Sequence, residues 1–251
     1  MTSIEKAVIT FKNNIEAVYQ LADLDRGVLD HTIEQLRERD ARLKAAGVTN
    51  SRWLSGNTLK NLENIRNHDS LRPGFQALVN QSAVLLASYF ASGVSQLFRS
   101  AVAVALKQGP SKQLEQHELK FTVKDLKSMG GDVLEAIPDL IAEGPGVSFQ
   151  DTKSIQRIFK DYLDVDVPRD EVTHDVSVEL ALRHVLVHNG GIVDRKCFRQ
   201  IEESFPRTFR REIKLGESIN FKTEEIRTIG GTMIEYVQRL AHESRSRVLT
   251  K

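Results

Sequence analysis

Apolar residues near the start of the chain repeat with the spacing of a helix face. From residue 15 to residue 43 every seventh position is apolar, through Ile15, Ala22, Leu29, Leu36 and Leu43. This period predicts one long N-terminal helix with an apolar stripe along one side. The stripe packs on the protein's own domain in one interpretation, and it forms a dimerising coiled coil in the alternative.

Prolines, glycines and capping residues divide the remainder into further helices. We expect a short helix ending near residue 67, a long one from about 72 to 109, and short ones over 122–129 and 132–142. A helix beginning at Asp151 follows. Asp170 caps the next helix, which stops at the Asn-Gly-Gly of 189–191, and a last helix runs from Thr223 towards His242 with Gly230-Gly231 as its weak point. Residues 219–221 form a short extended piece. The chain is predicted to be all-α, with an N-terminal helical extension over residues 1–70 and a helical bundle over 71–251.

One predicted helix contains a segment without charge that is long enough to span a bilayer. No charged residue occurs from Gly74 to Phe98. Amides and hydroxyls are spread through this segment, however, and unpaired amides are costly in lipid. We therefore expect a core helix of a bundle and no membrane association.

Composition narrows the classes of function. The formal net charge of +1 argues against a histone-like protein, so any contact with nucleic acid must be local. Cys197 is the only cysteine, and the N-terminal residues lack the apolar stretch of a signal peptide. These features predict a cytoplasmic protein. The sequence contains no GxSxG elbow, no P-loop and no GxGxxG opening a helix.

The helix predicted over 171–188 carries large polar residues in an otherwise apolar run. Most positions from 176 to 187 are Val, Leu or Ala, so this helix is predicted to be buried on nearly all sides. Glu179, Arg183, His184 and His188 then each need a partner, water or a ligand. Arg183 and His188 are about 140° apart around the axis, with ~7.5 Å of rise between them.

Three interpretations of these residues remain open. In a structural one, Glu179 and Arg183 form an i,i+4 ion pair and the histidines are satisfied interior groups. In the second, His184 and His188 share a metal ion, which would need further ligands. In the third, Arg183 and His188 perform ribonuclease chemistry, because arginine binds phosphate with a fork of donors and histidine moves protons near neutral pH.

The third interpretation gains support from a resemblance to a known family. Arg-His-Val-Leu-Val-His at 183–188 resembles the Arg-polar-x-x-x-His motif of HEPN domains, an all-helical superfamily rich in RNA-cutting toxins and defence proteins. The sequence from 188 to 194 resembles the His-Asn-x-Gly-x-x-Asp ending of abortive-infection members. The likeness covers about residues 74–245 and is specific only in the motif. Leu186 stands where the subgroup paired with nucleotidyltransferases has Tyr, so the resemblance does not extend to that toxin–antitoxin pairing.

The resemblance implies a metal-independent endoribonuclease without a cofactor. His188 would be the general acid/base while the RNA 2′-hydroxyl attacks the phosphate, and Arg183 would neutralise the transition state. His184 or Asn189 would position the scissile group, with Glu179 in support. The resemblance also implies a homodimer through the motif helices and a role as a toxin or phage-defence effector with an antitoxin or defence partner. The alternative is a non-catalytic HEPN-like module that binds a nucleotide, RNA or a protein.

The segment after the motif is basic and contains aromatic residues. Seven basic residues face three acids between 195 and 214, with Phe198, Phe205 and Phe209 among them. This composition favours single-stranded RNA, since bases stack on aromatic rings and phosphates pair with cations. A solvated loop with its phenylalanines in the core explains the pattern equally well. The predicted RNA-binding residues are Arg195, Lys196, Arg199, Arg207, Arg210, Arg211 and Lys214.

Overall fold

The computed structural model describes residues 1–50, 53–68, 71, 73–109, 112–119, 122 and 133–249. Over these residues the fold is all-α, as predicted, and contains no strand. An isolated antiparallel bridge joins Ile192 to Ser218, just before the predicted extended piece. In chain order the helices are α1 (Ser3–Ala22), α2 (Leu24–Ala45), α3 (Gly56–Asn67), the 3₁₀ turn η2 (Pro73–Phe75), α4 (Gln76–Gln108), α5 (Lys112–Glu115), α7 (Val133–Ala142), α8 (Thr152–Leu163), α9 (Glu171–His188), α10 (Arg195–Glu202) and α11 (Thr223–Leu249).

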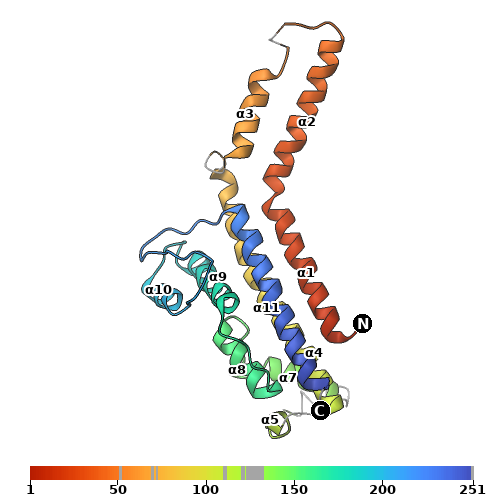
Figure 1. Ribbon diagram of the computed structural model, residues 1–251, viewed down its shortest axis with the longest axis vertical. Helices are drawn as coiled ribbons and strands as arrows, with labels where there is room; N and C mark the ends of the chain where they lie inside the picture. Colours follow the sequence, from red (N-terminus) through yellow and green to blue (C-terminus); the bar gives the residue numbers. More distant parts are fainter. Residues whose placement is uncertain are drawn as a thin grey trace.

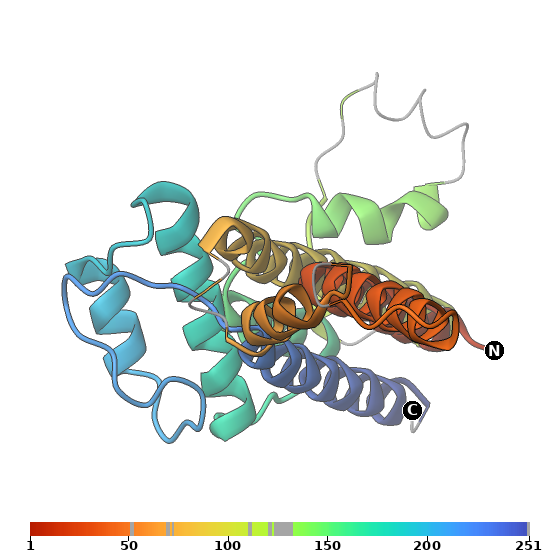
Figure 2. The ribbon, with the colours of Figure 1, turned by 90° about the horizontal axis from the view of Figure 1, so that it is seen from above.

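The core is built around α4, which contacts α1, α11, α7 and α9 (Figures 1 and 2). Leu86, Phe90, Val94 and Phe98 of α4 are fully buried. Among the described residues α4 is also the one helix whose length and composition would allow it to cross a membrane. Its central place in the core confirms the prediction of a core helix.

Two glycines let α1 approach its neighbours closely. A Cβ at Gly93 of α4 would lie 2.7 Å from the ring of Phe11. A Cβ at Gly230 of α11 would lie 2.7 Å from Cε1 of Tyr19, whose hydroxyl donates to the carbonyl of Arg227 at 3.1 Å. The helix does not end at Gly230-Gly231, the predicted weak point, but continues to Leu249, and Gly230 makes room for α1.

The prediction of one long N-terminal helix is wrong, because the chain breaks at Asp23. Before the break, Ile15 and Ala22 are buried in the main core. After it, the stripe continues as half-buried Leu29, Leu36 and Leu43, and α2 packs along α3. The same apolar stripe thus packs first against the main core and then against α3.

Helices α2 and α3 form a hairpin that projects beyond the body of the protein (Figure 1). We call residues 24–50 and 53–67 the arm. Because α1 shares one core with α4 and α11, the predicted boundary at residue 70 does not separate two cores. The projecting part begins after Asp23 instead.

Most of the remaining predicted boundaries are confirmed. Helix α3 ends at Asn67, α8 begins after its cap Asp151, and α11 begins at Thr223. The described part of the helix expected over 132–142 is α7, with Pro138 inside it. Of the helix expected over 122–129, only Thr122 is among the described residues, where it is not helical. Helix α10 was not predicted.

Candidate functional site

Helix α9 is fixed at its N-terminus by a side-chain cap. Asp170 accepts a hydrogen bond from the amide of Thr173 at 3.1 Å and forms an ion pair with Arg239 of α11. These interactions satisfy an amide that the first turn leaves without a helical partner, and they tie α9 to α11. Both contacts hold the pKa of Asp170 below its usual value against the opposing effect of burial.

The C-terminal end of α9 is held by the motif turn, which we define as residues 189–194. Gly190 and Gly191 have φ angles of 59° and 80°, which glycine adopts without strain. Asn189 donates from Nδ2 to Asp194 Oδ2 at 2.6 Å, and Asp194 Oδ1 accepts from the amide of Cys197 at 2.7 Å. Asp194 thereby caps α10. Asn189, a predicted catalytic residue, thus links the end of α9 to the start of α10.

A groove of about 860 Å³ lies between α4, α8, α9 and α10. On α9 it is lined by Thr173, His174, Ser177, Leu180, Ala181 and His184, which fall within an arc of about 120° around the helix. Arg183 lines the groove at the edge of this arc, about 60° beyond Leu180 around the axis. The groove therefore brings Arg183 and His184 together.

His188 lies on the same arc, one turn beyond His184 and outside the groove lining. It is exposed, and its ring centroid is 4.6 Å from that of half-buried His184. Burial lowers the pKa of His184, and the neighbouring basic groups His188, Lys196 and Arg183 lower it further, opposed by Asp194. His184 is therefore neutral at pH 7. The predicted pair of Arg183 and His188 does not share the groove within one chain.

Glu179 is directed away from the groove. It is fully buried, and neither carboxylate oxygen has a hydrogen-bond partner within the protein. The Glu179–Arg183 ion pair of the structural interpretation is therefore not formed. Burial raises the pKa of Glu179 well above its usual value, and Glu225 raises it further against the opposing charge of Arg210. Burial therefore favours the protonated form of this side chain.

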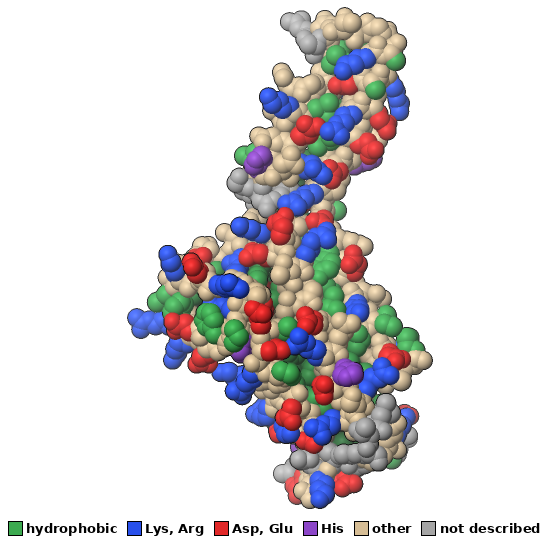
Figure 3. Space-filling view, viewed as in Figure 1, with side chains coloured by type: hydrophobic (Ala, Val, Ile, Leu, Met, Phe, Trp, Pro, Cys, Tyr) green, Lys and Arg blue, Asp and Glu red, His purple; other side chains and the backbone are tan. Residues whose placement is uncertain are grey.

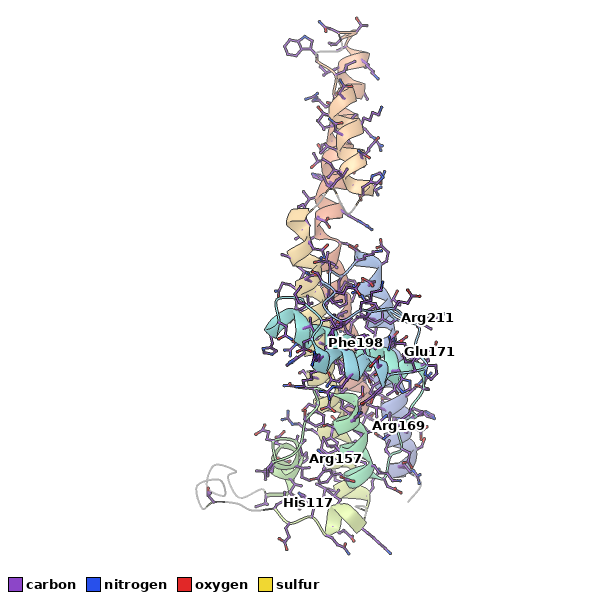
Figure 4. All side chains as sticks on the ribbon, turned by 90° about the vertical axis from the view of Figure 1, so that its left-hand side faces the viewer. His117, Arg157, Arg169, Glu171, Phe198 and Arg211 are labelled. Carbon is purple, nitrogen blue, oxygen red and sulfur yellow. The ribbon has the colours of Figure 1, made fainter. Side chains whose placement is uncertain are left out.

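The predicted RNA-binding residues fall into two groups. Five are exposed, on α10 and the loop after it: Arg195, Lys196, Arg199, Arg211 and Lys214. Lys196 also lines the groove. Lys and Arg side chains project along this edge of the molecule with acidic ones between them (Figure 3). Figure 4 shows this face from the front, with Phe198 and Arg211 on it and His117 at the lower end.

The other two predicted residues are held within the fold. Arg207 is buried and donates to the carbonyls of Ile201, Ser204 and Arg211. Arg210 binds both carboxylate oxygens of Glu225 at 2.8 Å. Both guanidinium groups have protein partners, so the exposed basic surface consists of the other five residues.

Three basic residues of the groove were missed from the sequence: Lys153, Arg169 and His174. Lys153 of α8 forms an ion pair at 2.8 Å with Glu203, which follows α10, and both residues line the groove. The spacing of residues 174, 177, 181 and 184 along α9 could have identified His174. Lys153 and Arg169 lie on other segments, where no local pattern marks them.

Among the residues that the structure describes, no three His, Cys, Asp or Glu side chains gather in a way that could hold a metal ion. His184 and His188 adjoin each other, and the described residues place no third such ligand beside them.

When the chain is compared with known proteins, no family model, no curated protein and no solved structure matches it.

Proposed function

We propose that this protein is an endoribonuclease that cleaves RNA through attack of the 2′-hydroxyl on the adjacent phosphate. The observation that carries the proposal is the arrangement at the end of α9. His184 and Arg183 face one groove with Lys196, and the ring of His188 adjoins that of His184. RNA supplies its own nucleophile, so the protein has to move protons and stabilise charge on the phosphate.

Each side chain then has a distinct task. The lowered pKa of His184 keeps its imidazole neutral at pH 7, so it can accept the proton of the 2′-hydroxyl. His188, the exposed partner, transfers the second proton to the departing 5′-oxygen. Arg183 binds the phosphate through its forked donors, and its buried Nε has no partner within the protein.

Total RNA incubated in EDTA with the wild type and with His188→Ala tests this function. Cleavage by the wild type and its loss in the variant is the expected result. Absence of cleavage by both, or equal cleavage by both, would refute the proposal. Cleavage that chelation alone abolishes would favour the metal interpretation of the two histidines.

Two further substitutions separate binding from catalysis. Arg183→Lys keeps a charge but loses the planar fork, so we expect slower cleavage with RNA still bound. His184→Ala should also slow cleavage with little loss of RNA affinity. If these residues are structural, both variants instead melt at lower temperature, because packing contacts of the two half-buried side chains are lost. Thermal melts and RNA-binding curves distinguish the two cases.

We further propose that the enzyme acts as a homodimer with the ends of the α9 helices facing each other. Val187, Ile192 and Leu215 are apolar and about half exposed, at the end of α9 and on the segments joined by the 192–218 bridge. Exposed apolar groups next to a motif are typical of an interaction surface. A dimer would bring a second Arg183 and His188 to the same site.

A second candidate function is nucleotide or RNA binding without catalysis. The groove supports it, because its volume lies within the range of small-ligand sites and its lining combines basic side chains with Leu180 and Ala181. RNA that binds the wild type tightly and stays intact would favour this candidate.

A further inference from the structure

The arm ends in an exposed aromatic residue that the protein holds in place. Trp53 is 68% exposed, and it is the only tryptophan of the chain. Its amide donates to the carbonyl of Asn50 at 3.1 Å, and its own carbonyl accepts from Arg39 at 3.3 Å. An exposed indole lacks the apolar contacts that a buried indole makes, and a bound ligand can supply them.

A buried acid fixes the turn that carries Trp53. Asp40 of α2 accepts from the amide of Ser55 at 2.7 Å and from its hydroxyl at 3.0 Å. Arg39 donates to the same hydroxyl at 2.5 Å. These bonds join α2 to the start of α3. We call residues 39–50 and 53–57 the arm tip.

Charge is divided along the arm. The described residues 37–50 and 53–63 contain five Lys or Arg side chains and three acids. Nearer the body, residues 23–36 and 64–67 contain four acids and two basic residues. Of the three acids near the tip, Asp40 is used by Ser55, Glu63 pairs with Arg37 at 2.5 Å, and Glu38 pairs with Arg42 at 3.3 Å. Since Arg42 is 82% exposed, this pair is weak and open to competition from another anion.

We propose that the arm tip binds single-stranded nucleic acid, with a base stacked on Trp53 and phosphates held by the basic side chains around it. An aromatic platform with adjacent cations is the arrangement by which proteins bind single strands without sequence preference. A membrane surface is disfavoured because Trp53 is the only large apolar side chain exposed on the described tip, whereas interfacial helices bury a broad apolar face. The arm projects from the body, so a strand can reach its tip without passing through the groove (Figure 1).

Fluorescence of the 251-residue chain tests this proposal, because Trp53 is its sole indole reporter. Oligothymidylate is the probe, since it lacks the 2′-hydroxyl and cannot be cut by the proposed reaction. We expect quenching of Trp53 that saturates and weakens with salt. The logarithm of the affinity falls with the logarithm of salt concentration, by about 0.7 for each phosphate contact on a single strand.

Matched variants assign the binding to the tip. Trp53→Ala should weaken binding, measured by anisotropy of a labelled oligonucleotide, on the order of tenfold, and Trp53→Phe should retain most of it. Leu24→Ala is the control, because Leu24 is 53% exposed at the opposite end of α2. Arg42→Gln should reduce the salt slope by about 0.7, whereas Arg66→Gln, near the other end of α3, should not.

Several results would overturn the proposal. Equal affinity of the Trp53→Ala and Leu24→Ala variants would show that the indole takes no part. Equal quenching by polyglutamate would show attraction of any polyanion without base stacking. A blue shift with phosphatidylserine vesicles, without quenching by oligothymidylate, would identify a lipid surface as the ligand. Because the probe cannot be cleaved, loss of binding at the tip is separate from failure of the ribonuclease proposal.

Discussion

Replacing the buried carboxyl group of Glu179 should stabilise the protein increasingly as pH rises. Glu179 is fully buried with no hydrogen-bond partner within the protein, and its pKa is raised well above 4.5. Between its unfolded and folded pKa values, the folded state binds a proton that the unfolded state has released. Wild-type stability therefore falls with pH in that window. Glu179→Gln removes this cost with a nearly isosteric side chain.

The size of the effect follows from the linkage relation. Each pH unit above the unfolded-state pKa costs the wild type about 1.4 kcal/mol. While the folded state keeps this proton, the variant gains about 2.5 kcal/mol relative to the wild type between about pH 5 and pH 7. The glutamine amide of the variant is also buried without a partner, and this lowers stability by an amount that does not depend on pH. That amount cancels when stabilities at the two pH values are compared.

Urea unfolding at several pH values measures this difference. Glu171→Gln is the control, because Glu171 is exposed in the first turn of the same helix, and its effect should change little with pH. A constant difference between Glu179→Gln and the wild type would refute the argument. If Glu179→Gln instead became less stable relative to the wild type as pH rises, Glu179 would be ionised and paired in the folded protein.

Three other predictions concern packing, catalysis and assembly. Gly230→Ala should lower the free energy of unfolding by about 1–3 kcal/mol, because the added Cβ meets Tyr19. Gly231→Ala should be neutral or slightly stabilising, because a Cβ there meets open space. Urea unfolding of both variants measures the difference. The cleavage rate should hold as pH falls to about 6.5 and decline only below that value, because His184 acts as a base with a lowered pKa; a decline beginning well above it would argue against that role. Val187→Asp should shift the proposed dimer to monomer in light scattering, and an unchanged mass, or a monomeric wild type, would count against the interface.

Helix boundaries that are set by capping residues and glycines could be predicted from the sequence. The helices against which a continuous apolar stripe packs could not. Asp170 and the Asn-Gly-Gly of 189–191 act within a few residues of themselves, so the limits of α9 were predictable. The break at Asp23 was not, because the seven-residue stripe continues unchanged across it. Its two halves differ only in what they pack against, the main core or α3, and that depends on distant residues.

Helix α10 was missed for a related reason. Its basic residues are conspicuous in the sequence, and they suggest a solvated loop or a binding surface. Its apolar residues are few, but buried Cys197 and Ile201 lie four apart on one face. Asp194 caps it, although the sequence pattern marks Asp194 only as the end of the motif.

The four polar residues of α9 have different environments because they lie at different angles around one buried helix. Taking His174 as zero, Glu179 falls at about 140°, Arg183 at about 180°, His184 at about 280° and His188 at about 320°. Residues 173, 174, 177, 180, 181 and 184 define the groove side, so His184 enters the groove and His188 extends that side beyond its end. Arg183 lies at the edge of this arc, about 60° from Leu180, and also lines the groove. Glu179 lies nearly opposite and is enclosed without a partner. The angles of these residues around α9 follow from the sequence. The side of α9 on which the groove forms depends on how α4, α8 and α10 pack around it.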